Sequence, residues 1–143
     1  MREEKISIND LNINYKIAGS GPAVLILHGW GGSSDSWEKI QKILSERNYS
    51  IICPDLPGFG KSQTPLSPWT LQDYIHFVLK FAENLHLNSF YLIGHSFGGR
   101  IAVKMAVNHS SMIKKLILCD PAGIKIKPGF TPGFFISAVI LLV

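Results

Sequence analysis

Cysteine is scarce in this chain of 143 residues, and histidine is absent after His109. The two cysteines, Cys53 and Cys119, each end an apolar run, and neither has the Cys-x-x-Cys spacing of a redox or metal site. We therefore expect two free thiols that behave as small hydrophobic side chains. The cysteine pattern predicts no metal centre.

Charged residues make up only 17% of the chain and hydrophobic residues 46%, which is typical of a globular protein with a core and excludes a disordered chain. The formal net charge is +4, but the lysines and arginines are scattered rather than gathered on one stripe. Basic residues spread in this way indicate a solvated surface, so we expect no nucleic-acid partner.

No secretory signal is visible, because the charged stretch 1–5 does not lead into an apolar region. A cytoplasmic location is the default expectation. The apolar stretch 134–143 is about half as long as a helix that spans a bilayer. We interpret it as a buried or lid-type helix, and a membrane segment that continues beyond it in a longer chain is the alternative left open.

Alternation of apolar and polar residues marks two short segments, 6–8 and 11–17, on either side of a turn-prone Asn9-Asp10 pair. This period of two predicts an antiparallel hairpin. Continuous apolar runs then follow, as is typical of parallel strands covered on both faces. These runs are 23–27, 51–53, 90–93 and 116–119.

Helical segments separate the apolar runs. Apolar residues keep helical spacing over 37–44 and 71–85, and the segment 101–107 is apolar nearly all round. Two pairs of residues resemble the capping boxes that begin helices: Asp35 with Glu38, and Thr70 with Asp73. The sequence therefore predicts an α/β fold, a mostly parallel, doubly wound sheet with helices on both faces and an N-terminal antiparallel hairpin.

The pattern Gly-x-Ser-x-Gly occurs at 94–98, between the apolar run 90–93 and a helical segment. A serine held in a sharp strand-to-helix turn is typical of the nucleophile elbow of acyl-transfer enzymes. Side chains at Gly94 or Gly98 would collide with the neighbouring strand or helix, so glycine is expected at both positions. The elbow would lift the hydroxyl of Ser96 clear of the sheet.

Two further glycine-rich loops, 28–32 and 55–62, follow the first two parallel strands. The second loop contains Gly60-Lys61-Ser62, but a phosphate-binding loop needs a glycine where this chain has Asp55. A dinucleotide fingerprint also fails, because Gln63 stands where the third glycine belongs. We therefore expect no nucleotide and no other cofactor.

These loops favour nucleophilic catalysis on a small-molecule acyl substrate. Ser96 would attack a carbonyl carbon, and the backbone N–H groups of Phe97 and Trp30 would stabilise the negative charge that develops on the oxygen. The N-terminus of the helix adds a partial positive charge at Phe97. Gly29, beside Trp30, would let the Trp30 amide point inward.

The loops 28–31, 55–62 and 94–99 together resemble those of the α/β-hydrolase superfamily, in its serine-nucleophile branch. The resemblance extends from the hairpin to the Asp120-Pro121-Ala122-Gly123 segment. It implies that residues 1–123 are the N-terminal part of a hydrolase core domain. Residues 124–143 would then be the start of a lid or a hydrophobic C-terminal segment.

The family carries its serine, acid and histidine in that chain order, with the histidine in a late loop. Asp120 is a candidate for the acid, with a hinge or bracing role as the alternative. His28 is expected to brace the oxyanion loop and His95 to have a structural role, and the remaining histidines are poor candidates for the base: His76, His86 and His109.

We therefore interpret the chain as the N-terminal part of a serine hydrolase, and expect the strand at 116–119 to be left as an open apolar edge. The alternative is a catalytically inactive fragment or a non-enzymatic module that lacks the triad histidine.

Overall fold

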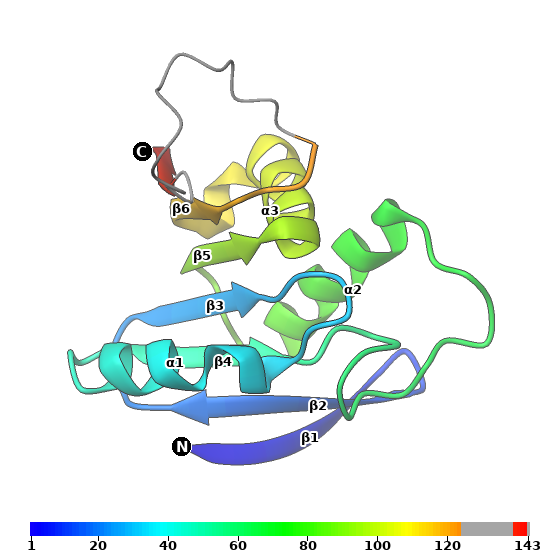
Figure 1. Ribbon diagram of the computed structural model, residues 1–143, viewed down its shortest axis with the longest axis horizontal. Coiled ribbons are helices and arrows are strands. Elements are labelled where there is room, and N and C mark those ends of the chain that lie inside the picture. The colour runs from blue at the N-terminus through cyan, green and yellow to red at the C-terminus, as the bar shows by residue number, and fades with distance from the viewer. Residues whose placement is uncertain (124–138, 143) are drawn as a thin grey trace, which may run out of the picture.

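A mixed sheet of seven strands runs through the described part of the computed structural model, which comprises residues 1–123 and 139–142 (Figure 1). The strand order is β1-β2-β4-β3-β5-β6-β7. The bounds are β1 (Arg2–Ile8), β2 (Leu11–Ala18), β3 (Ala23–Leu27), β4 (Ser50–Pro54), β5 (Phe90–His95), β6 (Ile113–Cys119) and β7 (Val139–Leu142).

The pairing within the sheet confirms the predicted fold class. The neighbours β4, β3, β5 and β6 are parallel, whereas β1–β2, β2–β4 and β6–β7 are antiparallel. The predicted hairpin is β1–β2, with Asn9 and Asp10 in the left-handed region at φ 48° and 63°, as a two-residue hairpin turn requires. The parallel strands point to the right in Figure 1, so the loops that follow them gather at one edge.

Helices cover both faces of the sheet. The helices α2 (Leu71–Asn84) and α3 (Ser96–Asn108) pack on one face, and α1 (Glu38–Ser45), which follows the 3-10 turn η1 (Ser34–Trp37), packs on the other. A second 3-10 turn, η2 (Ser110–Met112), precedes β6. Alternate residues of β3 divide between the two faces, because successive side chains of a strand point in opposite directions.

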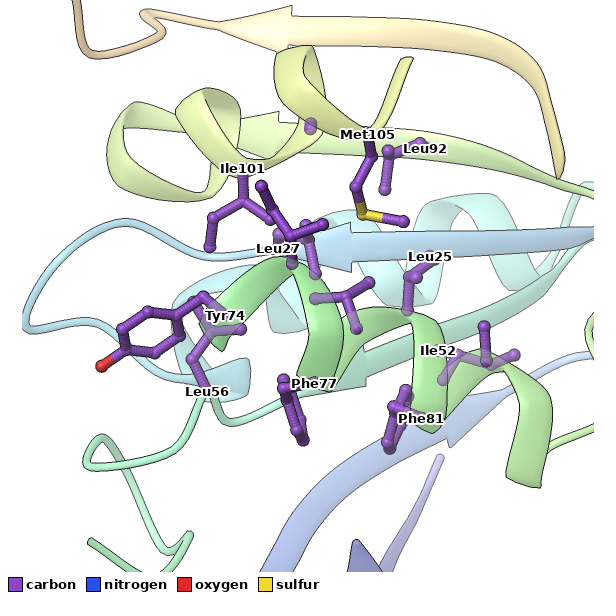
Figure 2. Packing of buried hydrophobic residues seen from close by; sticks show 14 of the residues in the cluster. Leu25, Leu27, Ile52, Leu56, Tyr74, Phe77, Phe81, Leu92, Ile101 and Met105 are labelled. Carbon is purple, nitrogen blue, oxygen red and sulfur yellow. The ribbon is translucent and has the colours of Figure 1, made fainter. Parts of the chain in front are cut away.

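The larger of the two cores lies on the α2 and α3 face. Figure 2 shows Leu25 and Leu27 of β3 among side chains from α2 and α3. Phe77 and Phe81 of α2 are both fully buried. The smaller core, on the α1 face, is built on Val24, Ile26, Ile51, Cys53 and Ile93.

The capping box predicted for α2 is confirmed, since Asp73 N–H donates to Thr70 Oγ1 and Thr70 N–H donates to an Asp73 carboxylate oxygen at 2.7 Å. The one predicted from Asp35 and Glu38 is wrong. Ser33 is the cap of η1, and both carboxylates bind the ammonium group of Lys16. Burial alone would lower the pKa of Lys16, but the hydrogen bonds to these carboxylates outweigh it and raise that pKa.

The apolar stretch 134–143 was expected to be a helix, and that expectation is wrong for residues 139–142. They form strand β7, which pairs with β6 in antiparallel register and covers the edge that was predicted to be open. An unpaired strand edge leaves backbone donors and acceptors without partners. Here the pairing with β7 supplies partners to the edge of β6. The remainder of the stretch, and the predicted start of a lid at 124–138, lie outside the described residues.

The two cysteines are free, as expected. Cys53 is fully buried, and Cys119 is only half-buried.

Two isoleucines on helices provide a matched test of this packing. Ile101 of α3 is fully buried, whereas 53% of Ile43 on α1 is exposed. Ile101→Ala removes buried methyl groups and leaves a cavity, so we expect the free energy of unfolding in urea to fall by about 2–5 kcal/mol. Ile43→Ala should change it by less than about 0.5 kcal/mol. Equal effects of the two substitutions would contradict the described core.

Candidate active site

The candidate site lies at the carboxyl edge of the parallel strands, where ligands bind in open α/β sheets. The loop 28–33 follows β3, the long segment 55–70 follows β4, Ser96 follows β5, and Asp120 follows β6. The sheet thus brings the three glycine-rich loops predicted from the sequence to one edge.

Ser96 occupies a turn that only small neighbours allow. Its φ is 48°, in the left-handed region that costs a non-glycine residue strain, and it joins β5 directly to α3. A Cβ on Gly94 would lie 2.6 Å from the carbonyl oxygen of Gly98, and a Cβ on Gly98 would lie 2.6 Å from that of His28. Both glycines are therefore required sterically. Ser96 itself is half-buried.

The two residues predicted to supply oxyanion amides lie against each other. The rings of Trp30 and Phe97 meet edge to face with centroids 5.2 Å apart. The loop that carries Trp30 approaches the elbow closely, because a Cβ on Gly29 would lie 3.2 Å from the Cβ of Ser96 and 2.8 Å from Nδ1 of His95. Gly29 therefore permits the contact between this loop and the elbow.

Asp55 joins the loops behind the site, and the sequence reasoning missed this role. Its carboxylate is 1% exposed and accepts hydrogen bonds from Ser34 N–H at 2.6 Å, Lys61 N–H at 2.9 Å and the Asn14 side-chain amide at 3.0 Å. It thus ties the loop after β3 and the loop after β4 to strand β2. A Cβ on Gly60 would overlap this carboxylate. The sequence feature that could have indicated this role is an acidic residue at the end of a strand, just before a Pro-Gly turn.

His28 is a second brace and is fully buried. Its Nε2 accepts from Leu56 N–H at 2.9 Å, so Nδ1 carries the proton and donates to the carbonyl oxygen of Gly29 at 2.8 Å. Burial lowers the pKa of this imidazole, which the hydrogen bond to Gly29 and the nearby Asp55 only partly offset. His28 thus connects the loop after β3 to the loop after β4.

His95 and Asp120 flank the elbow. The exposed His95 pairs with Cys119 across β5 and β6, and its ring lies 6.3 Å from that of Trp37. Asp120 directly follows Cys119 and therefore lies close to the elbow. Its φ is 45°, in the left-handed region. Ala122 N–H donates to the Ser96 carbonyl oxygen at 2.9 Å, which holds the segment after β6 against the elbow.

The other three histidines lie on helix α2 or just after the ends of α2 and α3. His76 is on the exposed surface of α2, and His86 follows the end of that helix. His109 follows the last residue of α3, and a helix of this length places it about 20 Å from its first residue at 1.5 Å per residue. Within the described residues, no histidine makes a hydrogen bond to the Ser96 hydroxyl.

Within residues 1–123 and 139–142, no three His, Cys, Asp or Glu side chains come together as a metal site would need. No helix in the same residues has the length and hydropathy to cross a bilayer.

A family model described as alpha/beta hydrolase fold matches residues 22–138. The chain belongs to this family. The match includes the loop of Trp30, the elbow at Ser96 and the segment after β6.

Relatives of this hydrolase-fold chain carry several names. A fluoroacetate dehalogenase of a Burkholderia species is 30% identical over 120 residues, 80% of this chain and 39% of that protein. A monoacylglycerol lipase of Xenopus laevis is 35% identical over 121 residues, 78% of this chain and 36% of that protein. The solved structure of a membrane phospholipase A, described as a bacterial virulence factor, has a TM-score of 0.83 at 32% identity. The match covers 87% of this chain and 41% of the phospholipase chain. The chain spans less than half the length of each of these relatives.

The charge on Asp55 can be tested with a substitution that preserves shape. Asp55→Asn turns one accepting oxygen into a donor that faces other donors, so we expect the free energy of unfolding to fall by about 1–3 kcal/mol. Asp10→Asn is the matched control, because Asp10 is exposed in the hairpin turn and asparagine tolerates its positive φ. Urea denaturation of both variants checks this, and an unchanged Asp55→Asn protein would refute the bracing role.

The lowered pKa of His28 predicts a pH dependence. The unfolded chain takes up a proton near the ordinary value of 6.5, whereas the folded chain does so only at lower pH. Stability should therefore be full above about pH 6.5, fall as the pH drops below it, and level off below the folded pKa. An NMR titration of the His28 ring measures this directly. Protonation at or above pH 6.5 would contradict the described hydrogen bonds.

Proposed function

We propose that this chain carries the nucleophile and the oxyanion site of a serine hydrolase that acts on an ester or other acyl compound. The observation that carries the proposal is Ser96 at a strand-to-helix turn with positive φ, between glycines that cannot be replaced without collision. A nucleophile in this position is presented at the end of the sheet with the N-terminus of α3 directly behind it.

The chemistry of serine favours acyl carbon over alkyl carbon. The names of the relatives include a dehalogenase, an epoxide hydrolase and a lipase, so they do not decide between these reactions. Attack of a serine oxygen on a haloalkane or epoxide would form an ether, which water does not cleave, and the enzyme would be consumed. Attack on an acyl carbon forms an ester that water can hydrolyse.

In the proposed first step, Ser96 Oγ forms a bond to the carbonyl carbon and gives up its proton to a base, which passes the proton to the departing alkoxide. The bond between the carbonyl carbon and the leaving oxygen then breaks. In the second step water attacks the acyl carbon and gives a proton to the base, the bond from that carbon to Ser96 Oγ breaks, Oγ takes the proton back from the base, and the carboxylic acid leaves. The tetrahedral oxygen is stabilised by N–H of Trp30 and of Phe97, and removal of one such donor costs about 3–4 kcal/mol.

Asp120 is the proposed acid, because the pairing of His95 with Cys119 places it beside the elbow. We propose that the base histidine belongs to the portion that the relatives have and this chain does not span, since no histidine of the described residues bonds to Ser96. The same observation supports the alternative function, a non-enzymatic hydrolase-fold module. Ester turnover by the purified 143-residue chain that is lost in Ser96→Ala would exclude this alternative.

The test of the proposal is labelling of the protein, in the form in which the cell makes it, with a fluorophosphonate. Ser96 should be the modified residue, and Ser96→Ala should abolish labelling and lower ester hydrolysis by at least about 1000-fold. Ser110→Ala, in the exposed turn η2, is the control and should react as the unmodified protein does. A folded protein that remains unlabelled, or a Ser96→Ala variant that still reacts, would overturn the proposal.

A further inference from the structure

A cavity of about 470 Å³ lies between the segment 57–69 and α2. Aromatic rings form much of its wall, from Trp30, Phe59, Trp69 and Tyr74. None of the residues that line it carries a charge. This size is within the range of small-molecule sites, which are mostly apolar and have few polar groups.

Phe97 does not line the cavity itself, but it connects two of the lining residues to the candidate nucleophile. The ring of Phe97 lies edge to face against Trp30, at 5.2 Å, and against Tyr74, at 5.0 Å. Phe97 follows Ser96 directly, and Trp30 and Phe97 carry the two proposed oxyanion amides. A substrate carbonyl held by these amides would therefore have one substituent directed along the Trp30 and Tyr74 rings.

The rim of the cavity exposes large apolar side chains. Trp30 is 71% exposed and Leu66 is fully exposed. Exposed apolar surface beside a concave site is typical of ligand-binding regions. The Tyr74 hydroxyl is already used, since it donates to the Pro57 carbonyl oxygen at 3.1 Å, so Tyr74 offers its ring rather than a polar group.

We propose that this cavity binds an uncharged apolar substituent of the reacting carbonyl, with a preference for an aromatic ring. The proposed substrates are therefore uncharged esters or amides that carry an arylalkyl group on the reacting carbonyl. The proposal rests on the proposed function for the placement of the carbonyl, but the cavity's preference for neutral aromatic ligands can be measured without any turnover. Edge-to-face contacts with the aromatic walls favour a ring, and a carboxylate would find no cation among the lining residues.

The binding test has an internal control, because Trp30 and Trp69 line the cavity and Trp37 does not. We expect phenylacetamide, titrated into the 143-residue chain, to shift the indole N–H signals of Trp30 and Trp69 in a saturable way while that of Trp37 stays unchanged. Acetamide should shift none of them. Phenylacetate, which is charged, should bind at least about tenfold more weakly than phenylacetamide because its charge loses solvation without a partner.

Substitutions separate the cavity from the rest of the fold. Trp69→Ala should weaken phenylacetamide binding by at least about tenfold, through loss of an aromatic contact and its buried area. Trp69 also packs on Tyr74 and Phe77, so its removal could alter the fold as well as the cavity. Leu66→Ser is therefore the second variant. It cannot disturb the core, because Leu66 is fully exposed. Leu66→Ser should weaken binding by about threefold or more. Ile43→Ser, another exposed aliphatic position, should leave binding unchanged.

Unshifted Trp30 and Trp69 signals would overturn this inference, and would be the result if a segment of the chain itself fills the cavity. Equal affinity for phenylacetamide and phenylacetate, or an effect of Ile43→Ser as large as that of Leu66→Ser, would overturn it as well. Failure of the proposed function has a different signature. Ser96 would then resist the fluorophosphonate while the indole shifts persist.

Discussion

The structure depends on a close approach of backbone segments at the carboxyl edge of the sheet. The first turn of α3 lies directly on the carbonyl groups at the end of β3, and a Cβ on Gly98 would overlap the Leu27 carbonyl oxygen. Gly29 allows the loop after β3 to reach the elbow in the same way. This contact puts Ser96 and the Trp30 loop together before any polar interaction is considered, and Ser96 itself stands at the junction of a strand and a helix, as a precise site requires.

Buried polar groups then hold the loops in position. Asp55 and His28 are both buried, and their ring and carboxylate atoms bond to backbone groups of the loops after β3 and β4. Burial of such groups is costly unless they are paired, so each is tolerated because its partners are in place. The aromatic wall formed by Trp30 and Phe59 packs outside this network, and therefore rests on a fixed base.

Local patterns in the sequence were sufficient for the fold class, because the period of the apolar residues and the Thr70–Asp73 cap depend on neighbouring residues. Features that depend on distant partners were not predicted. The pairing of Asp35 with Lys16 requires β2 to lie beside η1, and the role of Asp55 requires three separate segments to converge. Strand β7 was missed because four apolar residues are equally compatible with a helix until the edge of β6 is present to pair with them.

A crystal structure of the protein after phosphonylation of Ser96 is the most direct test of the central claim, that the backbone contact places one hydroxyl opposite two main-chain amides. The account predicts a phosphoryl oxygen about 2.7–3.1 Å from the backbone nitrogens of both Trp30 and Phe97. A phosphoryl oxygen that points into solvent, with either amide bonded elsewhere, would contradict it.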